Sequence, residues 1–156
     1  GVPEPLALFA SATAGPARRD VSEYTVAKTD AQLTARLREL KGTDEAVLGN
    51  GELMQLMLPI MRADFLLCGS FVHGQRPALA LPIHVFRGKQ DSVRAEQLLD
   101  WQADTSSVFS LDMFEGHHFF LVEQEQPLLR CVRRYLEEHL ARWRNHQARQ
   151  LAGVSV

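Results

Sequence analysis

Three short apolar runs, separated by stretches with helical spacing, constrain the fold of this 156-residue chain more than any other feature. The runs cover residues 5–12, 82–88 and 108–114, and glycine or proline lies close to each of them. Runs of this length are typical of buried strands. Helical patterns between strands predict right-handed crossovers and parallel pairing, so the expected fold class is α/β.

The helical patterns begin after a polar stretch, residues 15–28, that is predicted to be a surface loop. Thr29 or Asp30 is expected to cap a first helix that ends near Lys41-Gly42. A short turn follows, and residues 52–71 then form a longer apolar helix. Pro59 lies inside that helix and removes a backbone hydrogen bond, so we expect it to kink or divide the helix.

Two more helices are predicted in the second half of the chain. Residues 93–102 fit a helix between the second and third apolar runs, and residues 127–147 form a long amphipathic one. The arginines of this last helix are expected to face solvent, with contact to a partner protein as the alternative. They are Arg130, Arg133, Arg134, Arg142 and Arg144.

Three strands are few for a parallel sheet, because such a sheet has both faces covered and usually contains more strands. The first run also lies within a few residues of the beginning of the sequence. We therefore expect that the chain begins in mid-domain and that part of the sheet lies outside it.

The overall charge and the cysteines narrow the class of partner. The formal charge is −2, from 17 Lys and Arg against 19 Asp and Glu. The chain therefore has no net positive electrostatic potential that would attract nucleic acid or an anionic membrane. No signal peptide is predicted, since the chain does not open with a basic region followed by a long apolar one. No membrane span is predicted either, since Gln55, Pro59, Arg62 and Asp64 interrupt the longest apolar stretch. The two cysteines have no metal-binding or redox spacing, so they are predicted to be buried free thiols of a cytoplasmic protein.

Ligands of open α/β sheets bind at the carboxyl ends of the strands, and two loops there carry candidate residues. The loop after residues 82–88 ends in Asp91, and the loop after 108–114 carries His117 and His118. A carboxylate beside an imidazole is the orienting half of a nucleophilic triad. The alternatives are a helix cap for the aspartate and a structural role for either histidine. A metal site is not expected, since adjacent histidines point in different directions.

Six segments in order resemble the carboxy-terminal part of the type II thioesterases that accompany nonribosomal peptide and polyketide synthases. They are LALFASA (6–12), KGTDEAVL (41–48), LPIMRADF (58–65), PIHVFRGKQD (82–91), Trp101 and FEGHHFF (114–120). The resemblance covers most of the chain. It implies the α/β-hydrolase fold, of which residues 1–156 would be the carboxy-terminal part of one domain, with residues 29–72 as a helical lid.

The resemblance also implies catalytic residues. The triad aspartate of that family ends a Gly-x-x-Asp motif, which is Asp91 here, and its histidine precedes Phe-Phe, which favours His118 over His117. His117 stands where a second glycine is usual in the family. No Gly-x-Ser-x-Gly occurs in the sequence, so the nucleophilic serine is expected to lie outside this chain.

The implied function is hydrolysis of acyl or aminoacyl thioesters on the phosphopantetheine arm of an acyl or peptidyl carrier protein, without a cofactor. This editing would serve antibiotic or siderophore biosynthesis. Met54, Met57, Met61 and Phe65 of the lid would line the acyl pocket, with plain core packing as the alternative. The rival functions are a general small-ester hydrolase of the same fold and a binding or assembly fragment without catalysis.

Overall fold

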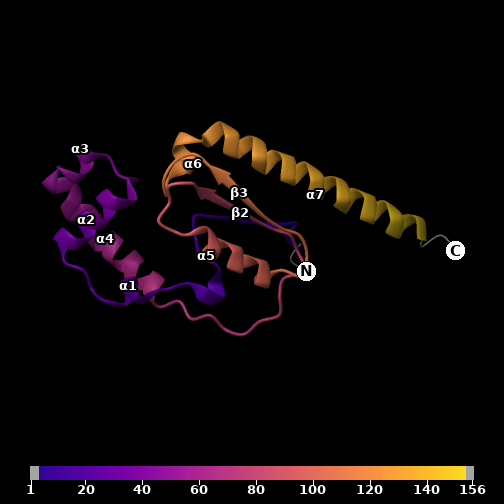
Figure 1. Cartoon of the computed structure of the whole chain (residues 1–156), viewed down its shortest axis with the longest axis horizontal. Coiled ribbons are helices and arrows are strands. Elements are labelled where there is room, and N and C mark those ends of the chain that lie inside the picture. Colours follow the sequence, from indigo (N-terminus) through magenta and orange to yellow (C-terminus); the bar gives the residue numbers. More distant parts are fainter. Residues whose placement is uncertain (1–3, 154–156) are drawn as a thin grey trace.

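The computed structural model describes residues 4–153, and a three-stranded parallel sheet lies at its centre (Figure 1). The strands are β1 (Leu8–Ser11), β2 (Ile83–Gly88) and β3 (Phe109–Phe114), in the spatial order β1-β2-β3. All three predicted strands are confirmed, and their parallel pairing brings the carboxyl ends of β2 and β3 to one edge.

One face of the sheet packs against helix α5 (Ala95–Leu99) and the 3-10 helix η2 (Asp100–Asp104). Ile83 and Val85, alternate residues of β2, join Leu98 in a buried apolar cluster on this side. The helix predicted over residues 93–102 is therefore present, with a shorter α-helical part.

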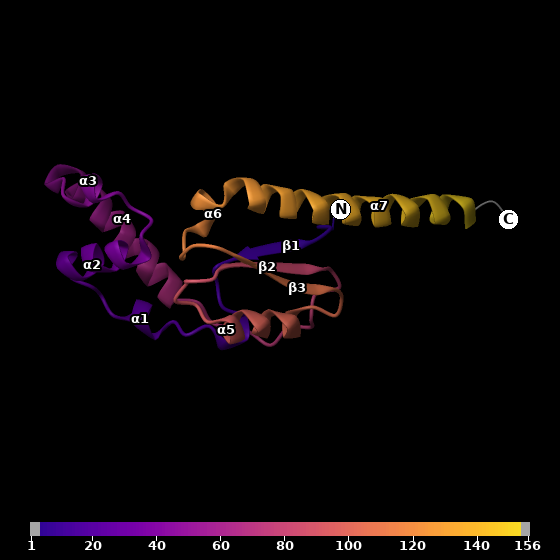
Figure 2. The same cartoon turned by 45° about the horizontal axis from the view of Figure 1, so that its top comes forward.

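The other face is covered by helix α7 (Glu125–Gly153), which follows the short helix α6 (Phe120–Glu123). His84 and Phe86 of β2 point to this side, and Tyr135 of α7 packs with both the histidine ring and the Phe86 cluster. Figure 2 shows α7 and α5 on opposite sides of the strands. Both faces of β2 are covered, as is usual in a parallel sheet, so Ile83, His84, Val85 and Phe86 are all buried.

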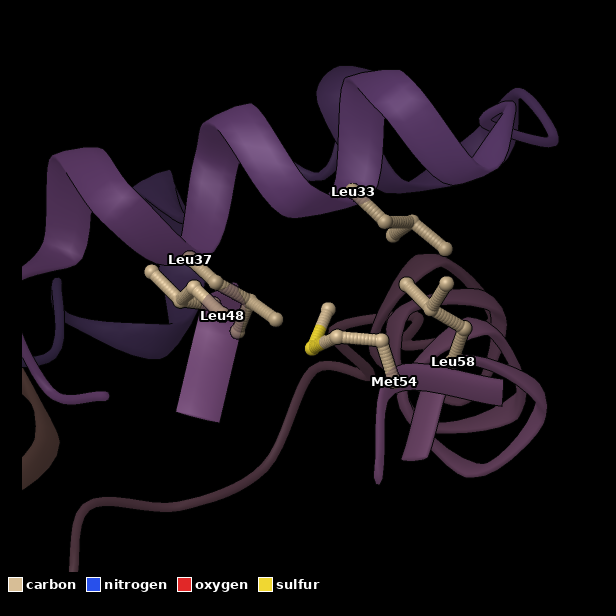
Figure 3. Close-up of a cluster of buried hydrophobic side chains, with 5 residues drawn as sticks. All are labelled: Leu33, Leu37, Leu48, Met54 and Leu58. Atoms are coloured by element: carbon tan, nitrogen blue, oxygen red, sulfur yellow. The ribbon is translucent and has the colours of Figure 1, made fainter. Parts of the chain in front are cut away.

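Three helices form a separate helical segment, residues 30–69, beyond the carboxyl ends of the strands (Figure 1). They are α2 (Asp30–Leu40), α3 (Glu45–Leu48) and α4 (Gly51–Gly69). Figure 3 shows their shared apolar core, which consists of Leu33, Leu37, Leu48, Met54 and Leu58. This core is distinct from the two clusters that cover the sheet, so the segment carries its own packing.

Polar caps fix where the helices of this segment begin. Thr29 and Gln32 form a reciprocal capping box at α2, in which the Thr29 N–H donates to Gln32 Oε1 over 2.9 Å. The Asp44 side chain accepts the Ala46 N–H at α3, and Asn50 caps α4 in the same way. The prediction that Thr29 or Asp30 caps the first helix is confirmed, with Thr29 as the cap.

Helix α4 continues through Pro59, so the proline does not divide it. Pro59 withdraws one hydrogen bond, the one that the Gln55 carbonyl would have accepted. Both residues are exposed, and water can satisfy that carbonyl. Met54 and Leu58 before the proline and Met61 after it pack into the same core, which holds the two halves in one helix.

The stretch predicted as a loop, residues 15–28, contains two short helical turns. They are η1 (Pro16–Arg18) and α1 (Ser22–Thr25). Tyr24 of α1 packs against the Phe65 ring with centroids 5.4 Å apart, so this stretch is tied to α4.

The solvent exposure predicted for the arginines of α7 is confirmed, whereas the cysteines are less buried than predicted. Arg62 forms an ion pair with Asp30, and the five arginines of α7 are exposed. Both cysteines, Cys68 and Cys131, are free thiols and are partly buried. No helix within residues 4–153 combines the length and apolar character that a bilayer crossing requires.

Candidate catalytic site

The loops that follow β2 and β3 are joined by backbone and side-chain hydrogen bonds. The Lys89 N–H donates to the Phe114 carbonyl over 2.8 Å, and the Gln90 N–H donates to the Gly116 carbonyl over 3.0 Å. The Gln90 Oε1 in turn accepts the Gly116 N–H at 2.7 Å. Gln90 therefore holds Gly116 through both its backbone and its side chain, and the two loops form one unit.

Two glycines allow this close approach. A Cβ on Gly88 would overlap the carbonyl oxygens of Gly116 and His117. Gly116 itself has a φ of 109°, a conformation that side-chain-bearing residues rarely adopt. Close packing at Gly88 and the backbone conformation at Gly116 thus explain why a glycine precedes each of the two candidate catalytic residues.

Asp91 lies at the end of the first loop with its side chain fully buried. Its Oδ1 accepts the Val93 N–H over 3.0 Å. The Arg87 guanidinium donates to the Val93 carbonyl over 2.7 Å and to the Asp91 carbonyl over 3.1 Å. Hydrogen bonds from Arg87 thus stabilise the loop that carries the Asp91 carboxylate.

The structure brings Asp91 and His118 together. His118 Nδ1 lies 3.2 Å from Asp91 Oδ2 and 3.3 Å from Oδ1. Burial acts to raise the pKa of the Asp91 carboxyl, but the hydrogen bonds from His118 and Val93 outweigh it, and the pKa is lowered. An ionised carboxylate accepts only, so His118 donates through Nδ1 and its Nε2 is left free to accept a proton.

A cavity of about 470 Å³ lies beside His118. Its walls include Arg36 and Leu40 of α2, Tyr24 of α1 and Ser92, which follows Asp91. The imidazole side chain is 28% exposed, so it is open to this space, whereas its carboxylate partner is not. This arrangement can take up and return a proton at a substrate bound in the cavity.

The four predicted lid residues lie elsewhere in the present conformation. Met54 is buried in the core of the helical segment, and Met61 and Phe65 pack against that core. Neither these residues nor the partly buried Met57 line the cavity beside His118. The helical residues that do line the cavity belong to α1, α2 and α5, and they are Glu23, Tyr24, Arg36, Leu40 and Gln97.

Two serines share the cavity with His118. Ser11 ends β1, and Ser92 Oγ lies 3.5 Å from Asp91 Oδ1. Within residues 4–153, neither hydroxyl forms a hydrogen bond with His118. In the same part of the chain, no three His, Cys, Asp or Glu side chains are grouped to hold a metal ion.

His117 points away from Asp91 and contacts a residue that sequence reasoning missed. Its Nε2 lies 3.2 Å from Lys41 Nζ, and its Nδ1 lies 3.3 Å from the Gln90 carbonyl oxygen. The Lys41-Gly42 pair signals a helix end, and Lys41 does adopt the left-handed conformation of a C-cap. No local sequence pattern signals its contact with a loop that lies so much further along the chain.

A second histidine pair, His84 and His139, lies between the sheet and α7. Their Nε2 atoms are 2.7 Å apart, and His84 Nδ1 lies 2.7 Å from Ser110 Oγ. Burial lowers the pKa of His84 to about 4, helped by the neighbouring His139, and burial also lowers the pKa of His139. Both imidazoles are therefore neutral at pH 7, when one ring donates to the other.

Comparison with known proteins gives one consistent family. The Thioesterase domain family matches residues 2–136. The gramicidin S biosynthesis protein GrsT of Aneurinibacillus migulanus is 38% identical over 113 residues, which cover 72% of this chain and 44% of that protein. The chain spans about half the length of the curated relatives it matches.

Solved structures agree with this result and extend it to the fold. The type II thioesterase BorB from the borrelidin biosynthetic cluster is 33% identical, with a TM-score of 0.70 over 86% of this chain and 54% of that one. ClbQ from the colibactin NRPS/PKS pathway is 27% identical, with a TM-score of 0.78 over 90% of this chain and 60% of that one. These neighbours are thioesterases of the α/β-hydrolase fold.

Proposed function

The chain belongs to the Thioesterase domain family, and from this premise we propose that it hydrolyses acyl or aminoacyl thioesters on the phosphopantetheine arm of a carrier protein. The observation that carries the proposal is the His118 imidazole held by the buried Asp91 carboxylate at 3.2 Å, beside an open cavity. The roles of similar proteins in gramicidin S, borrelidin and colibactin biosynthesis support a carrier-bound substrate.

The nucleophile of this proposal is a serine outside the 156 residues. The sequence contains no Gly-x-Ser-x-Gly, the strand-to-helix turn that exposes the serine in this fold. The complete enzyme is this chain together with the segment that supplies that serine. The backbone amides that stabilise the oxyanion would come from the same segment.

In the first half of the reaction, the serine oxygen attacks the thioester carbonyl carbon. His118 Nε2 takes the serine proton, and Asp91 stabilises the imidazolium that results. The carbon–sulfur bond then breaks, and the phosphopantetheine thiol leaves with the proton that His118 returns. The acyl group is now an ester of the serine.

In the second half, water resolves the acyl-enzyme. His118 Nε2 accepts a proton from the attacking water, and the carbon–oxygen bond to serine breaks. The serine oxygen recovers its proton from His118, and the free acid leaves. Both halves use the same imidazole nitrogen, which is the one that Asp91 does not bind.

The helical segment is proposed to be the lid over this site, within the domain range 29–72. Its support is that Arg36 and Leu40 at the end of α2 form part of the cavity wall. The acyl contact predicted for Met54, Met57, Met61 and Phe65 stays a prediction.

The free thiols Cys68 and Cys131 support a reducing compartment such as the cytoplasm.

Hydrolysis of loaded carrier protein by the complete enzyme tests the proposal. We expect release of acyl or aminoacyl groups from the carrier protein, and much slower turnover of a small oxygen ester of the same acyl group. The reverse preference would favour a general small-ester hydrolase. Carrier-protein binding with no hydrolysis of either substrate would favour a non-catalytic binding or assembly fragment.

A further inference from the structure

The corner at the end of α2 contacts both sequence neighbours of His118. Lys41 Nζ lies 3.2 Å from His117 Nε2. Gly42 lies so close to the Phe119 ring that a Cβ on residue 42 would overlap it. Phe119 in turn packs edge-on against the His118 ring, with centroids 5.1 Å apart. The helical segment therefore contacts the residues on both sides of the candidate base in the sequence.

The position of Lys41 is set by the helix that it ends. Its φ of 57° and ψ of 27° give it the left-handed conformation of a C-cap, and its N–H donates to the Arg38 carbonyl over 3.2 Å. Leu37, one turn earlier, is buried in the core of the helical segment. The Lys41 backbone is thus fixed as the C-cap of α2, and its side chain extends from that end of the helix.

The partners of His117 determine its tautomer. A lysine ammonium only donates hydrogen bonds, so His117 Nε2 must accept the bond from Lys41. The proton of the neutral ring is then on Nδ1, which lies 3.3 Å from the Gln90 carbonyl oxygen and can donate to it. A chain of polar contacts therefore runs from α2 to the residue that precedes Asp91.

We infer that His117 is a positioning residue that fastens the helical segment, through Lys41, to the loops that carry Asp91 and His118. Arg36 and Leu40 of the same helix line the cavity, so the contact sets the place of one cavity wall relative to the imidazole. The structural part of the inference stands by itself, and its effect on substrate binding rests on the proposed function.

Amide hydrogen exchange on the full chain tests the structural part. His117→Ala and Lys41→Met should each speed exchange in α2 and α3 by about three- to tenfold, the range expected for loss of one hydrogen bond. His117→Gln, which can still accept from Lys41, should restore most of the protection. The matched controls His146→Ala and Arg144→Met remove a histidine and a cation from the exposed surface of α7, and should leave the exchange of α2 unchanged.

The double variant Lys41→Met/His117→Ala sharpens the test. Each single variant already removes the whole contact, so exchange of α2 and α3 in the double variant should be no faster than in either single variant. Unchanged exchange in both single variants, or additive effects in the double variant, would overturn the inference. Neither result depends on enzymatic activity.

Kinetics of the complete enzyme test the effect on substrate. His117→Ala should raise KM several-fold while kcat stays within about twofold, because a displaced wall weakens binding and leaves the imidazole in place. A matching fall in kcat with unchanged KM would contradict it. Absence of hydrolysis in the unaltered enzyme would instead count against the proposed function and leave the exchange result valid.

Discussion

Two pairs of histidines in this chain have opposite surroundings. His117 and His118 lie on a loop at the carboxyl edge of the sheet, where one imidazole contacts a lysine and the other a buried aspartate. His84 and His139 lie between the sheet and α7, each almost fully buried and bonded to the other. The contrast shows that partners and solvent access, rather than residue type, decide what an imidazole can do.

The two pairs differ in whether an imidazole nitrogen is left without a hydrogen-bond partner in the described part of the chain. His118 uses Nδ1 for Asp91, and its Nε2 faces no protein partner within residues 4–153. His84 uses both nitrogens, one with Ser110 and one with His139. A ring with a free nitrogen beside a cavity can move protons, whereas a ring with both nitrogens engaged stabilises the packing of α7 on the sheet.

The largest expected effect comes from removing the base. His118→Ala in the complete enzyme should lower kcat for carrier-bound thioester about 10⁶-fold, as loss of a triad histidine does elsewhere. The matched control is His139→Gln, which alters the buried pair and should leave kcat within about threefold while lowering stability. Equal losses of turnover in the two variants would remove the distinction between the pairs.

Removing the orienting charge should have the next largest effect. Asp91→Asn places an amide where the carboxylate accepts, which favours the wrong imidazole tautomer, and kcat should fall about 10³- to 10⁴-fold. Circular dichroism should show the same fold as before. Asp64→Asn, at an exposed position of α4, is the matched control. Turnover of Asp91→Asn within tenfold of the original would contradict the role of Asp91.

The buried pair should appear in the pH dependence of stability. His84 has a pKa of about 4 in the folded chain against 6.5 when unfolded, so below pH 6.5 the unfolded chain binds a proton that the folded chain does not. Stability is therefore lost as the pH falls from 6.5 to 4, by up to about 3 kcal/mol from this group. Urea unfolding at four pH values between 7 and 4 measures it.

His84→Gln isolates that contribution. The variant should be less stable at pH 7 but should lose less stability on acidification than the original chain does. Both proteins contain the same carboxylates, so their titration affects both equally. Because the pKa of Asp91 is lowered, its protonation affects stability mainly below pH 4. An equally steep loss in the variant would show that His84 is not held neutral.

The smallest effect is expected at the two serines beside His118. Ser11→Ala and Ser92→Ala should each leave kcat within about threefold, because the nucleophile is proposed to lie outside this chain. Steady-state hydrolysis of loaded carrier protein is the measurement. A loss near that of His118→Ala at either position would place the nucleophile within these 156 residues.

Much of the fold follows from local sequence patterns. Each strand is an apolar run of strand length, and Thr29 with Gln32 marks the first helix by its capping chemistry. Short turns such as α1 lack a full helical period, so residues 15–28 offered no such signal. The helix is not divided at Pro59, because side chains on both sides of the proline pack into one core, which local sequence does not show.

The candidate site was predictable only in part. Asp91 and His118 follow neighbouring parallel strands, so their meeting is a consequence of topology. The Lys41–His117 and His84–His139 contacts join segments from different elements, and no periodicity or motif encodes them. Such contacts depend on how the helices are placed against the sheet, which a single sequence does not specify.

The most direct test of the central claim is active-site labelling of the complete enzyme with a fluorophosphonate, followed by peptide mapping of the adduct. We predict that a serine outside these 156 residues is labelled, and that His118→Ala slows labelling at least about 100-fold while His139→Gln does not. Labelling at the same rate in His118→Ala, or an adduct on Ser11 or Ser92, would contradict the account.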